Sequence, residues 1–338
     1  MPVTASEIGG PIAHGGNLSR ARALFPHAPE PWIDLSTGIN PYSYPHSPLP
    51  DNAFARLPDP ALAERLKAIA AEAYGAPSAA HMAAGPGTQI LLPILASLLG
   101  QGGKATILSP TYAEHARAAR MAGFEVTETD DLDRLASADL AVIVNPNNPT
   151  GRIVSKSDLL ALAAIMRAKG GLLVVDEAFV DVSEAASAAD AVDAGGLIVL
   201  RSFGKFYGMA GLRLGFAISR PDIARRIEGQ LGPWAVSGPA LHIASEALAD
   251  GRWQAMMRQR LRDDATNLDI LLIGAGIPVF GGTSLFRFVR DARAQAIFRH
   301  LGERGIVTRR FEERPDDLRI GLPDKNGWRR LEDALKTI

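Results

Sequence analysis

The 338-residue chain contains no cysteine, which excludes disulfides, thiolate metal ligands and a cysteine nucleophile. Net charge is also nearly absent, because 36 basic and 37 acidic side chains give −1. That charge provides no broad field for nucleic acid or a membrane surface. No apolar run approaches a membrane span, the first residues lack a secretory signal, and the seven histidines show no metal-ligand spacing. We therefore expect a cytoplasmic protein without a metal ion, a nucleic-acid partner or a membrane partner.

The distribution of proline, glycine and apolar runs divides the chain into an arm and two domains. Residues 1–50 are rich in Pro, Gly, Ser and His, which predicts an extended arm with little regular structure. Over 51–232, short apolar strands alternate with Ala- and Leu-rich helices, the pattern of a mainly parallel sheet with helices on both faces. A long, bent helix at 238–274 and several strands then predict a smaller α/β domain at 233–338, packed with the arm. The predicted fold class is α/β.

One lysine, Lys205, lies in a sequence context that is unusual for a solvent-exposed lysine. Lys205 follows the apolar run 197–200, which predicts a buried strand, and lies in a loop rich in glycine and aromatic residues. Ser202 precedes it and Arg213 follows it. A lysine amine for a Schiff base, together with a hydroxyl and a cation for a phosphate, is what pyridoxal 5′-phosphate (PLP) requires. The alternative is a solvated lysine that happens to follow a strand.

Two earlier strand ends supply polar groups that fit the same cofactor. The apolar run 172–175 ends in Asp176, at the edge where open α/β sheets bind ligands. A carboxylate beside the pyridine nitrogen keeps that nitrogen protonated, which makes the ring an electron sink. The run 141–144 leads into a turn-rich segment, Asn-Pro-Asn-Asn-Pro-Thr-Gly, that contains Asn148.

These motifs together resemble the fold-type I PLP enzymes, the aspartate aminotransferase superfamily. The resemblance rests on Asn-Pro-x-Asn-Pro-Thr-Gly, Val-Val-Asp-Glu-Ala and Ser-Phe-x-Lys-x-x-Gly-x-x-Gly-x-Arg-x-Gly, between 145 and 215. It implies PLP as cofactor, a mainly parallel large domain, a smaller α/β domain and a homodimer. It also implies Lys205 for the Schiff base, Asp176 for the pyridine nitrogen, Asn148 for the ring 3′-oxygen, and Ser202 and Arg213 for the phosphate.

Two upstream segments acquire roles through the same resemblance. Gly87 and Thr88 begin a predicted helix whose first amides suit an anion, although a glycine turn before a helix can be purely structural. Tyr112 lies where the family has an aromatic side chain stacked on the pyridine ring; a core tyrosine is the alternative. The expected catalytic residues are Lys205, Asp176 and Tyr112.

Three positions depart from the family pattern, each by losing a hydroxyl. Phe179 stands where many members have tyrosine near the 3′-oxygen, and Gly204 stands where many have serine before the lysine. Leu57 precedes Pro-Asp-Pro, where histidinol-phosphate aminotransferases usually have a tyrosine that reaches the partner subunit. These departures argue against the histidinol-phosphate branch.

The arm contains the most discriminating motifs for substrate. His14-Gly15-Gly16-Asn17 places glycine amides beside a histidine and an amide, a composition that suits a small anion. Three motifs resemble the L-threonine O-3-phosphate decarboxylases of cobalamin biosynthesis. They are the His-Gly-Gly-Asn motif, the segment Leu-Ser-Thr-Gly-Ile-Asn-Pro, which contains Gly38, and the segment Pro-Trp-Ala-Val. As the alternative, His14 only orders a mobile arm.

Arg319 fits the C-terminal arginine with which the family binds the substrate α-carboxylate, a task suited to a planar two-donor group. The expected substrate-binding residues are His14, Gly15, Gly16, Asn17, Gly38, Asn148 and Arg319. The resemblance implies decarboxylation of a small phosphorylated amino acid, L-threonine O-3-phosphate, to (R)-1-amino-2-propanol O-phosphate. A histidinol-phosphate-type aminotransferase and, more remotely, a non-catalytic PLP-fold sensor are the alternatives.

Overall fold

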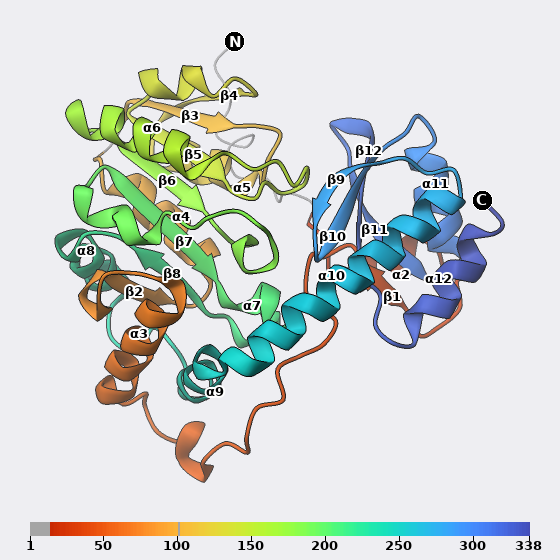
Figure 1. The fold of residues 1–338 in the computed structure, drawn as a ribbon, viewed down its shortest axis with the longest axis horizontal. Helices are drawn as coiled ribbons and strands as arrows, with labels where there is room; N and C mark the ends of the chain where they lie inside the picture. Colours follow the sequence, from red (N-terminus) through yellow and green to blue (C-terminus); the bar gives the residue numbers. More distant parts are fainter. Residues whose placement is uncertain (1–13, 101) are drawn as a thin grey trace. The chain divides into compact units, whose positions relative to one another are not determined.

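The computed structural model describes residues 14–100 and 102–338, which form two compact units, each with its own sheet (Figure 1). The described part of the large unit comprises Tyr44–Asn148 and Ile153–Arg252. The small unit comprises residues 14–43, Pro149–Arg152 and Trp253–Ile338. These limits differ from the expected ones at 51 and 232.

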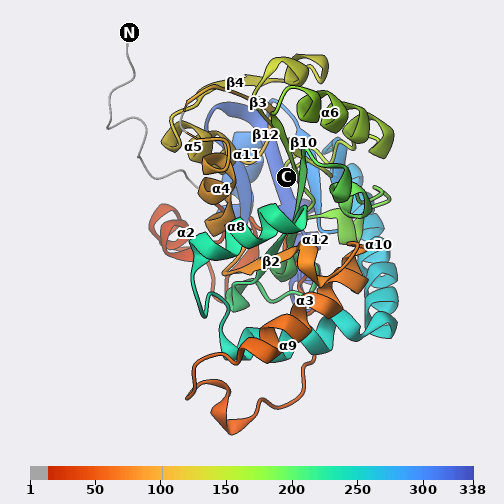
Figure 2. The ribbon, with the colours of Figure 1, turned by 90° about the vertical axis from the view of Figure 1, so that its left-hand side faces the viewer.

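The boundary expected after residue 232 lies instead after Arg252, and the packing of the large unit gives the reason. The helix α9 (Gly238–Ala249) packs beside α3 (Pro60–Tyr74), as Figures 1 and 2 both show. The single bent helix expected over 238–274 is in fact two helices, because Asp250 leaves the helical conformation between α9 and α10 (Gly251–Gly274).

The large unit is built on a seven-stranded sheet of order β2-β8-β7-β6-β5-β3-β4. The run from β4 to β7 is parallel, and β8 is antiparallel to both of its neighbours. This agrees with the mainly parallel sheet expected from the sequence. The strands are β2 (Met82–Gly85), β3 (Lys104–Leu108), β4 (Glu125–Thr129), β5 (Leu140–Val144), β6 (Leu172–Asp176), β7 (Leu197–Ser202) and β8 (Gly215–Ile218).

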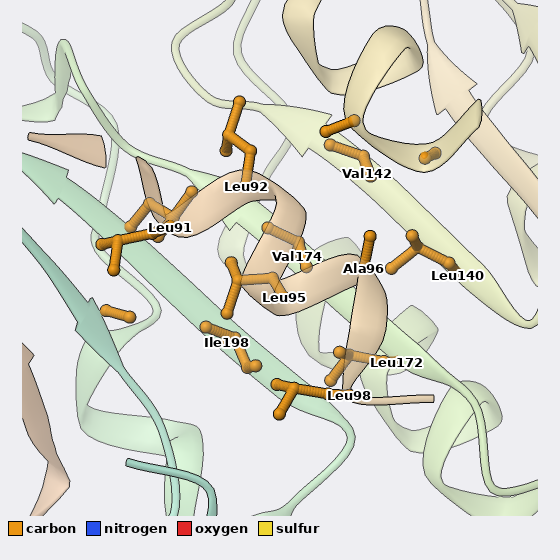
Figure 3. Close-up of a cluster of buried hydrophobic side chains, with 14 of the residues drawn as sticks. Leu91, Leu92, Leu95, Ala96, Leu98, Leu140, Val142, Leu172, Val174 and Ile198 are labelled. Carbon is orange, nitrogen blue, oxygen red and sulfur yellow. The ribbon is translucent and has the colours of Figure 1, made fainter. Parts of the chain in front are cut away.

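The core of this unit forms where helix α4 (Thr88–Ser97) crosses the central strands. Leu91, Leu92 and Leu95 face Val174 and Ile198, all nearly inaccessible to solvent (Figure 3). Alternate residues of each strand point to this face, and the intervening ones point to the other. The remaining helices are α5 (Glu114–Met121), α6 (Lys156–Ala168), α7 (Phe203–Phe206) and α8 (Pro221–Leu231), with 3-10 turns η1 (Asp51–Ala53), η2 (Ala79–His81), η3 (Asp133–Ser137), η4 (Val180–Val182), η5 (Ala189–Ala194) and η6 (Ala210–Leu212).

The small unit has a five-stranded sheet of order β1-β11-β12-β10-β9. Its strands are β1 (Ile33–Leu35), β9 (Val279–Thr283), β10 (Phe286–Arg290), β11 (Ile306–Phe311) and β12 (Arg314–Gly321), and its helices are α2 (Leu18–Leu24), most of α10, α11 (Ala294–Glu303) and α12 (Gly327–Leu335). The arm is more regular than expected, because it contributes α2 and the strand β1, which pairs parallel with β11. No helix in the described ranges is long and apolar enough to cross a membrane.

Candidate active site

A cavity of about 150 Å³ lies in the large unit, at the carboxyl ends of the central parallel strands. Val144, Asp176 and Ser202 end β5, β6 and β7 and line it, and Lys205 follows from the short helix α7. The structure brings into this one cavity all of the expected cofactor residues: Gly87, Thr88, Tyr112, Asn148, Asp176, Ser202, Lys205 and Arg213.

One end of the cavity is built for an anion. Gly87 caps α4 at φ 86°, and a Cβ there would lie 2.6 Å from Nη2 of Arg213. The missing side chain therefore lets the guanidinium reach the N-terminus of α4. A Cβ on Gly215 would likewise lie 2.6 Å from the Thr88 amide nitrogen. Helix amides, the Ser202 hydroxyl and a guanidinium are the donors that a phosphate group needs.

Arg213 itself has a strained backbone. Its φ is 55°, in the left-handed region that side chains other than glycine rarely adopt, at a cost of about 1–3 kcal/mol. Its Nη1 donates to the Ala210 carbonyl at 3.2 Å, which anchors the side chain. We infer that this backbone conformation is kept, despite its energetic cost, because it orients the guanidinium towards the cavity.

Asp176 is oriented by two donors. The buried imidazole of His115, on α5, lies 2.9 Å through Nε2 from Oδ2 of Asp176, and the Ala178 amide donates to Oδ1 at 3.1 Å. Because an ionised carboxylate only accepts, this contact requires the proton on Nε2. Sequence reasoning missed His115; its signal was its place three residues after Tyr112, on the buried side of a helix.

The Tyr112 ring is also fixed from α5. Its hydroxyl donates to Gln89 Oε1 at 2.9 Å, the Gln89 amide donates to Glu114 at 2.8 Å, and Arg117 donates to the same carboxylate at 3.2 Å. The ring meets His115 edge-on, with centroids 5.9 Å apart. A ring held in this way can form a stacking platform.

Only the third asparagine of the turn-rich segment lines the cavity. Asn145 exchanges hydrogen bonds with the main chain of Val154 at 2.8 and 3.1 Å. Asn147 accepts from the Thr111 hydroxyl at 2.7 Å and donates to the Pro110 carbonyl at 2.8 Å. These two hold the turn, whereas Asn148 is directed to the cavity.

The three departures from the family pattern lie in different surroundings, and the structure explains one of them, Gly204. A Cβ on Gly204 would lie 2.7 Å from Cα of Ala210, so a serine there would need the backbone to move. Phe179 is buried and lines the cavity, with its ring centroid 5.7 Å from Nζ of Lys205. Leu57 is 68% exposed on the large unit.

The small unit contains a second group of cations. Arg319 on β12 is buried and donates through Nη2 to the Ser36 carbonyl at 2.7 Å. Arg309 on β11 lies directly opposite in the antiparallel register, so the two side chains share a face. Burial, followed by the charge of Arg309, lowers the pKa of Arg319 to about 10, against an opposing effect of Asp34. Like charges placed opposite each other are unfavourable, and an anionic ligand would relieve that cost.

The expected arm residues lie close to this pair in the small unit. His14, Gly15 and Asn17 line a cavity of about 50 Å³ with Arg309 and Arg310. The Asn17 side chain also caps α2 by accepting from the Arg20 amide at 2.9 Å, a role that sequence reasoning did not assign. Gly38 is buried in the loop after β1 and lines neither cavity.

Ser36 links the arm to Arg319, and sequence reasoning missed it. Its hydroxyl accepts from the Gly16 amide at 2.8 Å and donates to Asp34 at 2.5 Å, while its carbonyl accepts from Arg319. A Cβ on Gly15 would collide with that carbonyl. The paired glycines of the arm motif therefore serve close packing on Ser36.

Comparison with known proteins gives one family and near full-length relatives. The family model described as aminotransferase class I and II matches residues 30–335. A threonine-phosphate decarboxylase from Sinorhizobium sp is 45% identical over 96% of this chain and 98% of its own length. Another, from Pseudomonas aeruginosa, is 42% identical over 96% and 97%.

Among solved structures, the fold resembles a histidinol-phosphate aminotransferase from Sinorhizobium meliloti in complex with PLP. The TM-score is 0.82, with 99% of this chain and 98% of that chain covered. At 20% sequence identity, this likeness concerns the fold alone.

Proposed function

The chain belongs to the aminotransferase class I and II family, and we propose that it is a PLP-dependent decarboxylase of L-threonine O-3-phosphate. Its fold is the PLP-transferase fold type I. The observation that carries the substrate assignment is the near full-length match to threonine-phosphate decarboxylases at 42–45% identity. The products are CO2 and (R)-1-amino-2-propanol O-phosphate, in cobalamin biosynthesis.

The cofactor is PLP, and the large-unit cavity fits it. The amides at Thr88, the Ser202 hydroxyl and Arg213 would hold the phosphate, and Asp176 would hold the pyridine nitrogen. Asn148 would donate to the ring 3′-oxygen. When bound, PLP supplies a sink for the electron pair left at Cα after a bond to it breaks.

The polypeptide contributes protons and orientation to this chemistry. Asp176 would hold a proton on the pyridine nitrogen, and the hydrogen bond from His115 fixes the orientation of its carboxylate. Lys205 would hold the cofactor through Nζ, and the same amine would be the acid that returns a proton to Cα. Phe179 adds an apolar wall beside Lys205 that carries no competing hydroxyl.

The small unit selects the substrate by its two anionic groups. We assign the α-carboxylate to Arg319, whose buried guanidinium is held by Ser36. We assign the phosphate to the cavity with His14, Gly15 and Asn17, where Arg309 adds positive charge. The facing pair of Arg309 and Arg319 supports a substrate with two negative groups.

We also propose a homodimer. The support is the resemblance to fold-type I PLP enzymes, and the exposed Phe54, Leu57 and Trp234 of the large unit, 78%, 68% and 56% accessible, are side chains that a second copy could cover. Sedimentation should give a dimer at assay concentration; an active monomer would contradict this. The cytoplasmic location stays a prediction.

One assay separates the proposed reaction from its alternatives. The purified enzyme should release CO2 from threonine phosphate with no keto-acid acceptor. An aminotransferase would instead require 2-oxoglutarate and yield glutamate. Absorbance at about 420 nm without either reaction would indicate a sensor that binds PLP as a Schiff base.

A further inference from the structure

A buried charged cluster lies next to the cofactor residues in sequence but on the other face of the sheet. Glu177 follows Asp176, and Arg201 precedes Ser202. Because successive strand residues point to opposite faces, Asp176 and Ser202 line the cavity while their neighbours point away from it. Glu177 is 0% exposed and Arg201 is 4% exposed. Neither has a role in the chemistry described above.

Arg201 is the centre of this cluster. Its Nη2 donates to Asp181 at 2.5 Å and its Nη1 lies 3.4 Å from Glu177 Oε2. Its guanidinium also lies 4.2 Å from the ring centroid of Tyr74. Burial alone would lower the pKa of Arg201, but the charges of Asp181 and Glu177 outweigh it and raise the pKa.

Glu177 is held independently on its other side. The Ser187 hydroxyl donates to Oε2 at 2.6 Å and the Ala188 amide donates to Oε1 at 2.8 Å. Its own amide donates to the Leu200 carbonyl at 2.9 Å, which continues the pairing of β6 with β7. The two strand ends are thus joined by a main-chain hydrogen bond and by a side-chain ion pair.

Stability alone is a weak reason for such a cluster. Replacing a buried ion pair by apolar side chains of similar volume is often neutral or stabilising. What the cluster provides is fixed geometry between two strand ends, since its contacts are directional. One strand end presents the carboxylate for the pyridine nitrogen, and the other presents a hydroxyl for the phosphate. These groups serve opposite ends of the same cofactor.

We propose that Arg201, Glu177 and Asp181 form a positioning cluster that fixes the spacing of Asp176 and Ser202 and thereby sets the affinity for PLP. The three act through those two neighbours and do not touch the cofactor. The proposal rests on the cofactor and not on which amino acid is decarboxylated, so it stands or fails separately from the substrate assignment.

The test uses Arg201→Lys, which keeps the charge but loses the two-pronged donor, and Asp181→Asn, which removes one anchor. Apoenzyme is titrated with PLP, and the holoenzyme absorption band is followed against pH. We expect PLP affinity to fall about tenfold or more, as when supporting contacts of a bound group are removed. The pH midpoint of the band should also shift, because Asp176 is displaced from the pyridine nitrogen.

Glu228→Gln is the matched control. Glu228 pairs with the buried Lys67 at 2.7 Å, in the same unit but outside the cavity lining. This variant should lower thermal stability and leave PLP affinity and the band unchanged. The proposal is overturned if Arg201→Lys and Asp181→Asn behave like this control. If Arg201→Lys does not fold, Asp181→Asn decides alone, because its PLP affinity must fall for the proposal to hold.

Discussion

Each unit buries one arginine, and the surroundings of the two are opposite in character. Arg201, in the large unit, lies against two carboxylates that raise its pKa. Arg319, in the small unit, donates to a carbonyl, faces Arg309, and has its pKa lowered to about 10 by burial and by that arginine. A buried cation compensated inside the fold belongs to the scaffold. For Arg319, which has Arg309 opposite it and the opposing charge of Asp34 nearby, we propose that the buried cation serves to bind an anionic ligand.

The comparison implies a division between the large unit, which performs the chemistry, and the small unit, which recognises the substrate. Lys205→Ala should have the largest effect and should separate the two roles most clearly. Turnover should be abolished because no other amine lines the cofactor cavity in the described ranges, while binding of the substrate anions should persist. Borohydride reduction of the wild type should fix PLP on the peptide that contains Lys205. Labelling of another lysine would overturn the site.

Asp176→Asn should have the next largest effect. The amide keeps the shape but loses the charge that holds the pyridine proton, so kcat should fall about 10²-fold or more. PLP should stay bound, and KM for threonine phosphate should change little, because we assign substrate recognition to residues of the small unit. A near-wild-type kcat would show that this carboxylate is not the pyridine partner.

His14→Ala tests the phosphate assignment in the small unit. Loss of one charge-assisted hydrogen bond should lower kcat/KM for threonine phosphate roughly ten- to a hundredfold. Unphosphorylated threonine should be affected less. Equal losses on both substrates would mean that His14 only orders the arm.

The smallest expected effect is the pH dependence of ligand binding. It tests Arg319, whose pKa is lowered, whereas the pKa of Arg201 is raised. If Arg319 binds the carboxylate as a cation, as we propose, affinity should be level from pH 7 to 9 and fall as pH rises through its pKa of about 10. Calorimetry with the 2-hydroxy-acid analogue of threonine phosphate avoids titration of the substrate amine. Affinity that stays level to pH 11 would contradict the assignment to Arg319.

The parts of the fold and the site that were predictable from sequence are local. The apolar runs at 141–144, 172–175 and 197–200 correspond to β5, β6 and β7, because a strand buried on both faces is apolar along its length. The polar residues that follow such strands must gather at one edge of the sheet. The sequence alone therefore places Lys205 and Asp176 together.

The supporting contacts could not be predicted because they join distant positions. His115 meets Asp176 across 61 residues, and Ser36 meets Arg319 across 283. No pattern within either segment indicates its partner. The arm was misjudged for a related reason: β1 is only three residues long and forms against β11, far along the chain.

The central claim is that Arg319 is held for a ligand, whereas Arg201 is held by the fold. Thermal unfolding of Arg319→Met and Arg201→Met, each with and without the 2-hydroxy-acid analogue, tests it directly. Arg201→Met should lose about 3–5 kcal/mol, because the buried Glu177 and the half-buried Asp181 lose their cation. Arg319→Met should lose only about 1–3 kcal/mol without ligand, because the buried Ser36 carbonyl loses its donor, and it should lose the stabilisation that the analogue gives the wild type. An Arg319→Met protein that is as unstable as Arg201→Met, or that the analogue still stabilises fully, would contradict the account.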